Sequence, residues 1–298
     1  TAVGDQAGKR ITTGVQNTLV GALAGDALTD ADFNIAVGMQ ALTADTLGSR
    51  STAMGFFALG SQNFTTATNS NNTAIGYSAG STVTTGTSNT LIGALSGDAL
   101  TDGNNNVAVG EGALGAETRG DRNVAIGNAT LSAQNNTTDV DAYNTAVGHA
   151  AGAAVTTGTK NTLIGGLAGD AITTGNENVA LGYTALSGDD VGHRSVAIGT
   201  ATLTNQNYAT STNSYNVAMG YNTGHNVTTG IQNTLIGGLA GDALTDADFN
   251  VAVGISTLSS DTKGNRSVAI GYAALETQNF TTSTDSYNTA VGALAGLS

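Results

Sequence analysis

The chain has 298 residues, with 42 glycines, no proline and no cysteine, so disulfides and thiolate metal sites are excluded. Its formal net charge of −13 argues against nucleic acid or an anionic membrane as a partner, because both require a basic surface. The sequence has no apolar run of about 18 residues, so we expect no direct insertion into a membrane.

A five-residue motif recurs along the whole chain. It consists of Asn or Ser, usually a β-branched residue, Ala or Leu, an aliphatic residue and Gly, as in Asn-Val-Ala-Ile-Gly at residues 123–127. The closing glycines are spaced by 17, 17, 17 and 21 residues in a cycle that repeats without exception, which gives 17 short coils. A fixed period of this kind is the signature of a repeat protein.

The four spacings combine into a super-repeat of 72 residues. A partial super-repeat at 1–71 precedes complete ones at 72–143, 144–215 and 216–287, and another begins at 288–298. We therefore expect a single repeat region instead of separate globular domains. The chain opens within a motif and closes just inside a coil, which predicts a section of a longer protein.

Each motif supplies three or four residues of strand character. Both faces of this segment are apolar, as expected for parallel strands buried on both sides. The short coil leaves no room for a helix beside the strand, so the sequence predicts an all-β parallel β-solenoid.

Strand alternation places Val107 and Val109 on one face and Ala108 on the other. If the valines fill the interior, Ala108 and its leucine equivalents form an outward apolar stripe. These equivalents are Leu19, Leu91, Leu163 and Leu235. Such a stripe is usually covered, and we expect sister chains to cover it.

The Asn that opens the motif is interpreted as a turn residue. Its side chain is expected to bond the backbone and to stack on its neighbour in the next coil. A polar ladder that binds a ligand is the alternative.

Four arginines end the third coils, and a carboxylate precedes each of them by five residues. The intervening turn predicts four structural ion pairs, Asp45–Arg50, Glu117–Arg122, Asp189–Arg194 and Asp261–Arg266. Recognition of a ligand by these arginines is the alternative.

Second coils carry an aspartate in register, at Asp26, Asp98, Asp170 and Asp242. The surrounding Leu-Ala-Gly-Asp-Ala pattern is close to the calcium-binding nonapeptide of β-rolls, but its glycine spacing differs and the nine-residue period is missing. We interpret these residues as turn aspartates and expect no metal and no cofactor.

The fourth coils contain four extra residues, within 63–71, 135–143, 207–215 and 279–287. These insertions predict polar loops that project from the solenoid and hold six aromatic residues. As candidate contacts to a sugar or a protein we name Phe64, Tyr143, Tyr208, Tyr215, Phe280 and Tyr287. The alternative is that they seal a seam between subunits or cover the loop's own backbone.

Catalysis finds little support in the sequence. The three histidines occupy no common repeat position, and no nucleophile elbow or phosphate-binding glycine loop is present. We therefore expect no enzymatic activity. The rival hypothesis is an enzyme that cleaves a polysaccharide with acidic residues.

The motifs Ser-Val-Ala-Ile-Gly at 195–199 and 267–271 resemble the head repeats of YadA-like trimeric autotransporter adhesins. The segment Asn-Thr-Ala-Ile-Gly-Tyr-Ser-Ala-Gly at 72–80 resembles the repeats of phage tail-fibre-like proteins more closely. The resemblance implies a left-handed β-roll with three chains side by side, on a bacterial cell surface or a virion. The coils are longer than those of the adhesin head, and the insertion is foreign to it.

Together these features predict a non-catalytic extracellular fibre segment, a homotrimeric stalk or head, with a surface glycan or host receptor as the candidate partner. One alternative is a self-assembling extracellular filament or sheath. The other is a single-chain solenoid that binds ice or glycan surfaces.

Overall fold

The computed structural model describes residues 1–297, which contain only strands, turns and bends and no helix. The prediction of an all-β parallel β-solenoid is confirmed, with about 17 turns in total. The chain divides into two compact units, Thr1–Asn144 and Thr145–Ser298. Within the described residues, no helix is long and apolar enough to cross a membrane.

In the first unit, one strand from each coil joins a parallel ladder. Its strands are β1 (Ala2–Val3), β2 (Thr18–Val20), β3 (Ile35–Val37), β5 (Thr52–Met54), β7 (Thr73–Ile75), β8 (Thr90–Ile92), β9 (Val107–Val109) and β11 (Val124–Ile126). Equivalent motif residues pair directly, for example Leu19 with Ala36 and Ala53 with Ala74.

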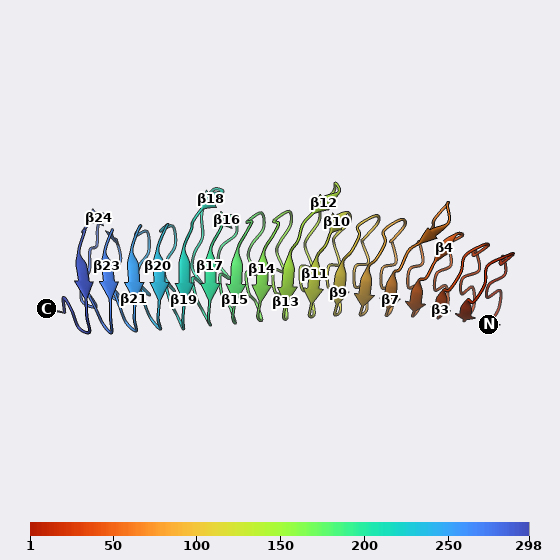
Figure 1. Cartoon of the computed structure of the whole chain (residues 1–298), viewed down its shortest axis with the longest axis horizontal. Coiled ribbons are helices and arrows are strands. Elements are labelled where there is room, and N and C mark those ends of the chain that lie inside the picture. Colours follow the sequence, from red (N-terminus) through yellow and green to blue (C-terminus); the bar gives the residue numbers. More distant parts are fainter. Residues whose placement is uncertain (298) are drawn as a thin grey trace. The chain divides into compact units, whose positions relative to one another are not determined.

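The second unit contains a ladder of the same kind. Its strands are β13 (Thr145–Val147), β14 (Thr162–Ile164), β15 (Val179–Leu181), β17 (Val196–Ile198), β19 (Val217–Met219), β20 (Thr234–Ile236), β21 (Val251–Val253), β23 (Val268–Ile270) and β25 (Thr289–Val291). Within each unit, Figure 1 shows the ladder strands side by side and pointing the same way.

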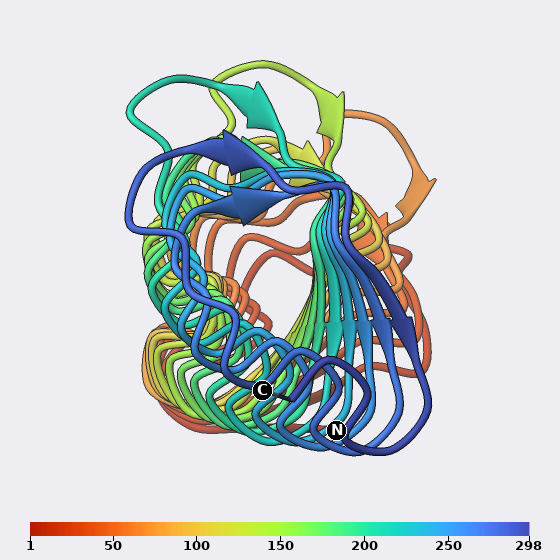
Figure 2. The same cartoon turned by 90° about the vertical axis from the view of Figure 1, so that its left-hand side faces the viewer.

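The fourth-coil insertions form short parallel pairs with the preceding coil. These pairs are β4 (Gly48–Ser49) with β6 (Thr68–Asn69), β10 (Gly120–Asp121) with β12 (Val140–Asp141), β16 (Gly192–His193) with β18 (Thr212–Asn213), and β22 (Gly264–Asn265) with β24 (Thr284–Asp285). In Figure 2 the loops that carry β6, β12, β18 and β24 project beyond the outline of the other coils. The predicted projection of these loops is confirmed.

The middle residue of each ladder strand points into the coil, so the predicted inside and outside of the strand are reversed. Ala108, Leu19, Leu91, Leu163 and Leu235 are all buried. The residues on either side of them, such as Val107 and Val109, face outward and are half-buried.

The size of the interior explains this reversal. Where the strand carries Leu91, the next segment carries Gly97, and a Cβ there would lie 2.7 Å from Leu91 Cδ2. Where the strand carries Ala108, the next segment supplies the fully buried Leu114. A narrow, close-packed interior has room for at most one leucine at these two positions in each coil, whereas β-branched residues are well suited to the outer strand face.

The closing glycine permits the close stacking of coils. Gly110 has φ +135°, and a Cβ on it would overlap the carbonyl of Gly127 in the next coil. No other residue type fits this combination of a positive φ and a close backbone approach.

The motif asparagines form a buried ladder, which confirms their interpretation as structural turn residues. Asn106 Nδ2 donates to Gly120 O at 2.8 Å, and its Oδ1 accepts from Asn123 N at 2.9 Å. Asn89 makes the equivalent bonds to Gly103 O and Asn106 N. Each side chain therefore bridges a turn of its own coil and the backbone of the next coil.

We expect Asn106→Ala to lower the free energy of unfolding by about 3 kcal/mol, because the change leaves buried backbone groups without their partners. Urea unfolding followed by circular dichroism measures this loss. The control is Asn128→Ala, which removes an exposed asparagine and should change stability little. Equal effects of the two substitutions would contradict a stabilising role for the ladder.

Candidate functional site

The aromatic residues predicted to contact a ligand fall into two groups. Phe64 is 6% exposed and Tyr208 is 4% exposed, and Phe280 is half-buried. The Tyr208 hydroxyl donates a hydrogen bond to Gly230 O at 2.8 Å. Phe64 and Tyr208 pack inside the base of their insertions, so the prediction of a ligand contact is wrong for these two.

Tyr143, Tyr215 and Tyr287 lie on the surface and are 48%, 48% and 68% exposed. An arginine guanidinium lies over each ring, at 5.6 Å for Arg122, 5.7 Å for Arg194 and 5.7 Å for Arg266. These distances fit cation–π contacts. A ligand role for the three tyrosines stays a prediction.

The four ion pairs predicted within the third coils are wrong. Arg122 pairs with Asp141, Arg194 with Glu177 at 2.8 Å and Arg266 with Asp285 at 3.2 Å. Arg50 lies over the Phe33 ring at 5.9 Å. The arginines therefore interact along the surface with residues of neighbouring coils.

The carboxylates of the expected pairs point inward, and Asp45, Glu117, Asp189 and Asp261 are fully buried. Asp45 accepts from Gly48 N at 3.0 Å, from Phe64 N at 3.1 Å and from Gln62 Nε2 at 2.6 Å. Gln62 in turn accepts from Asn72 Nδ2 at 2.8 Å. A buried carboxylate thus joins the start of the insertion to the asparagine ladder, and this is the physical reason why it is unavailable to arginine.

The same network recurs around Asp189 in the second unit. Asp189 accepts from Gly192 N at 2.9 Å and from Gln206 Nε2 at 2.6 Å, and Gln206 accepts from Asn216 at 2.8 Å. Burial is the main cause that raises the pKa of Asp189 to about 6, against the lowering effect of these hydrogen bonds. Burial also raises the pKa of Asp45.

The second-coil aspartates occupy half-buried turns. Asp170 Oδ1 and Asp242 Oδ1 are buried without a hydrogen-bond partner in the described chain, and burial raises the pKa of both residues. Residues 1–297 contain no group of three or more His, Asp or Glu side chains placed to hold a metal ion. Calcium binding therefore gains no support from their arrangement.

Exposed aromatic residues also stand immediately after several of the closing glycines, and the sequence-based predictions did not include them. Tyr77, Tyr183, Tyr221 and Tyr272 are about 60% exposed, and the rings of Phe56 and Tyr77 stack with centroids 5.5 Å apart. Their constant position one residue after the glycine was the signal that could have identified them.

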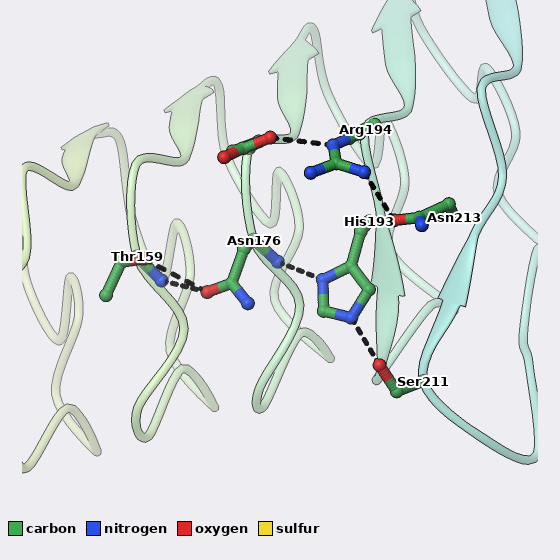
Figure 3. A pocket seen from close by; sticks show the side chains of 7 residues that line it. Thr159, Asn176, His193, Arg194, Ser211 and Asn213 are labelled. Carbon is green, nitrogen blue, oxygen red and sulfur yellow. Dashed lines mark hydrogen bonds and ion pairs between the residues drawn. The ribbon is translucent and has the colours of Figure 1, made fainter.

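A surface pocket in the second unit has a volume of about 300 Å³. Its lining residues are Thr159, Asn176, Glu177, His193, Arg194, Ser211 and Asn213. Figure 3 shows His193 and Arg194 at its centre, with Asn176 on one side and Asn213 on the other. Stacking of coils brings these residues together, because the lining comes from β16, β18 and the turns of the two preceding coils.

The hydrogen bonds of His193 argue against a catalytic Ser–His pair. His193 Nδ1 accepts from Asn176 N at 2.8 Å, so in the neutral ring the proton is on Nε2. Nε2 lies 2.6 Å from Ser211 Oγ and therefore donates to it, and it cannot remove the serine proton. Burial lowers the pKa of His193, and Arg194 adds to this effect, which favours the neutral ring.

The raised pKa of Asp189 predicts that protonation stabilises the fold. The protonated carboxyl contributes about 3 kcal/mol to the free energy of unfolding. This contribution is fully present below the ordinary pKa of 3.8 and is lost as pH rises through about 6. We expect Asp189→Asn to remove this part of the pH dependence in urea unfolding between pH 4 and pH 7. The control is Asp139→Asn, which alters an exposed loop carboxylate. Parallel pH profiles for the wild type and Asp189→Asn would refute the prediction.

No protein-family model matches this chain, and comparison with curated proteins finds no significant match. Function is therefore argued from the geometry and chemistry of the chain's own residues.

Proposed function

We propose that this chain is a structural segment of an extracellular fibre on a bacterial surface or a virion, without catalytic activity. In this proposal three copies pack side by side as left-handed β-rolls with coils of 17, 17, 17 and 21 residues. The repeat motifs that resemble adhesin heads and tail fibres support the proposal, as do the outer faces of the two ladders.

The outer face of the ladder is the observation that carries the proposal. Ile75, Ile126 and Leu181, which precede the closing glycine, are 37%, 38% and 42% exposed. The residues after the glycine add Tyr77 and Tyr183 to the same face. Each unit therefore presents one continuous column of aliphatic side chains before the glycines, with aromatic rings after some of the glycines, and an exposed apolar surface is usually covered by a partner.

The distribution of charge favours other copies of the chain as that partner. None of the described ladder strands contains a charged residue, although the whole chain carries a formal net charge of −13. Association through the strand face brings apolar columns together and leaves most acidic residues at the periphery. The regular spacing of the coils also lets identical columns match along their length.

Light scattering of the purified chain tests this proposal. We expect a β-rich particle with three times the mass of the 29.4 kDa chain. Ile75→Asp should reduce the trimer fraction, because it buries a charge in the proposed interface. The matched control is Thr65→Asp on an exposed insertion loop, which should leave the mass unchanged.

A stable β-rich monomer would contradict the trimeric fibre and would favour the single-chain surface-binding solenoid. Lengthwise growth seen by electron microscopy would instead favour the self-assembling filament or sheath.

A further inference from the structure

The pocket in the second unit is chemically different from the equivalent surfaces of the other super-repeats. His193 and Asn213 occupy the positions of Asp121 and Asp141 in the second super-repeat. In the fourth super-repeat, Ile231 and Phe249 stand where this pocket has Thr159 and Glu177. The pocket therefore combines polar side chains in an arrangement that occurs once among the super-repeats.

Internal hydrogen bonds hold these side chains in place. Arg194 Nε donates to Glu177 Oε2 at 2.8 Å, and its Nη1 donates to Asn213 Oδ1 at 2.9 Å and to the Tyr215 hydroxyl at 3.0 Å. Asn176 Oδ1 accepts from Thr159 N at 2.7 Å. The lining is therefore preorganised, which reduces the entropy lost when a ligand binds.

Several polar atoms of the lining keep unused hydrogen-bonding capacity. Glu177 Oε1, Arg194 Nη2 and the Nδ2 atoms of Asn176 and Asn213 have no partner among the described residues. Ser211 accepts from His193 and still has its own proton to donate. The pocket thus offers one charged acceptor beside several donors.

The charge of the pocket favours a neutral ligand. Glu177 and Arg194 compensate each other, and His193 is favoured in its neutral form. The formal net charge of −13 on the whole chain also disfavours a polyanion. A volume of about 300 Å³ accommodates one sugar ring.

We propose that this pocket binds one neutral saccharide unit of a surface glycan. Glu177 Oε1 accepts from one hydroxyl of a vicinal pair, while Arg194 Nη2 and Asn213 Nδ2 donate to the neighbouring oxygen.

This inference rests on the proposed role as a surface fibre for its biological meaning, but separate experiments test the two proposals. The mass of the particle tests the trimer, whereas saccharide binding tests the pocket in either oligomeric state.

The experiment uses saturation-transfer NMR on the full chain with the methyl glycosides of mannose, galactose and glucose, and with the methyl glycoside of N-acetylneuraminic acid as an anionic probe. We expect at least one neutral glycoside to bind in the millimolar range, as is usual for a single small polar ligand. Glu177→Gln should weaken this binding about tenfold, because it replaces a charged acceptor.

Arg194→Ala should abolish the saturation-transfer signal, whereas Arg122→Ala at the equivalent position of the second super-repeat should not change it. Circular dichroism and light scattering on each variant show whether it folds and assembles like the wild type. Three results would overturn the proposal: no neutral glycoside binds, the anionic glycoside binds better, or binding survives both Glu177→Gln and Arg194→Ala in folded protein.

Discussion

The fold depends on the buried asparagine that opens most of the coils. Its amide donates to a carbonyl of its own coil and accepts from the backbone of the next, as Asn106 does with Gly120 and Asn123. Without the asparagines, the strands of neighbouring coils would be joined only by the backbone hydrogen bonds of the ladder. The asparagine also fixes the turn before each strand, and its loss would leave several buried polar groups unpaired at once.

The fourth-coil insertion alters this ladder, and three of the four fourth coils open with Ser51, Ser195 or Ser267 in place of asparagine. At that point Asn72 keeps its bond to the backbone carbonyl of Gly86 and donates in addition to Gln62, which a buried carboxylate anchors. The carboxylate also binds the backbone where the insertion begins. The projecting loops are therefore fastened to the interior at their base, which gives the residues at their edges a fixed geometry.

The fold thus produces two surfaces with different chemistry. The ladder face is uncharged and apolar, which suits contact between copies of the chain. The insertion side carries arginine, carboxylate, amide and tyrosine side chains that interact between coils, as in the contacts of Arg194 with Glu177 and Tyr215. In the proposed fibre, the first surface would serve assembly and the second would serve recognition of a ligand.

The sequence by itself determined the parallel solenoid, the strand in each coil, the positions of the insertions and the structural role of the asparagines. These follow from a strict period and from residue types that have one conformational use, such as the glycine at Gly110.

Only the tertiary structure decided which strand face lies inside, because alternation shows that two faces differ and does not show which is buried. It also decided that Asp45 binds Gln62 and that Tyr208 is buried while Tyr215 is exposed. Those outcomes depend on contacts between stacked coils, where residues far apart in sequence compete for the same narrow interior.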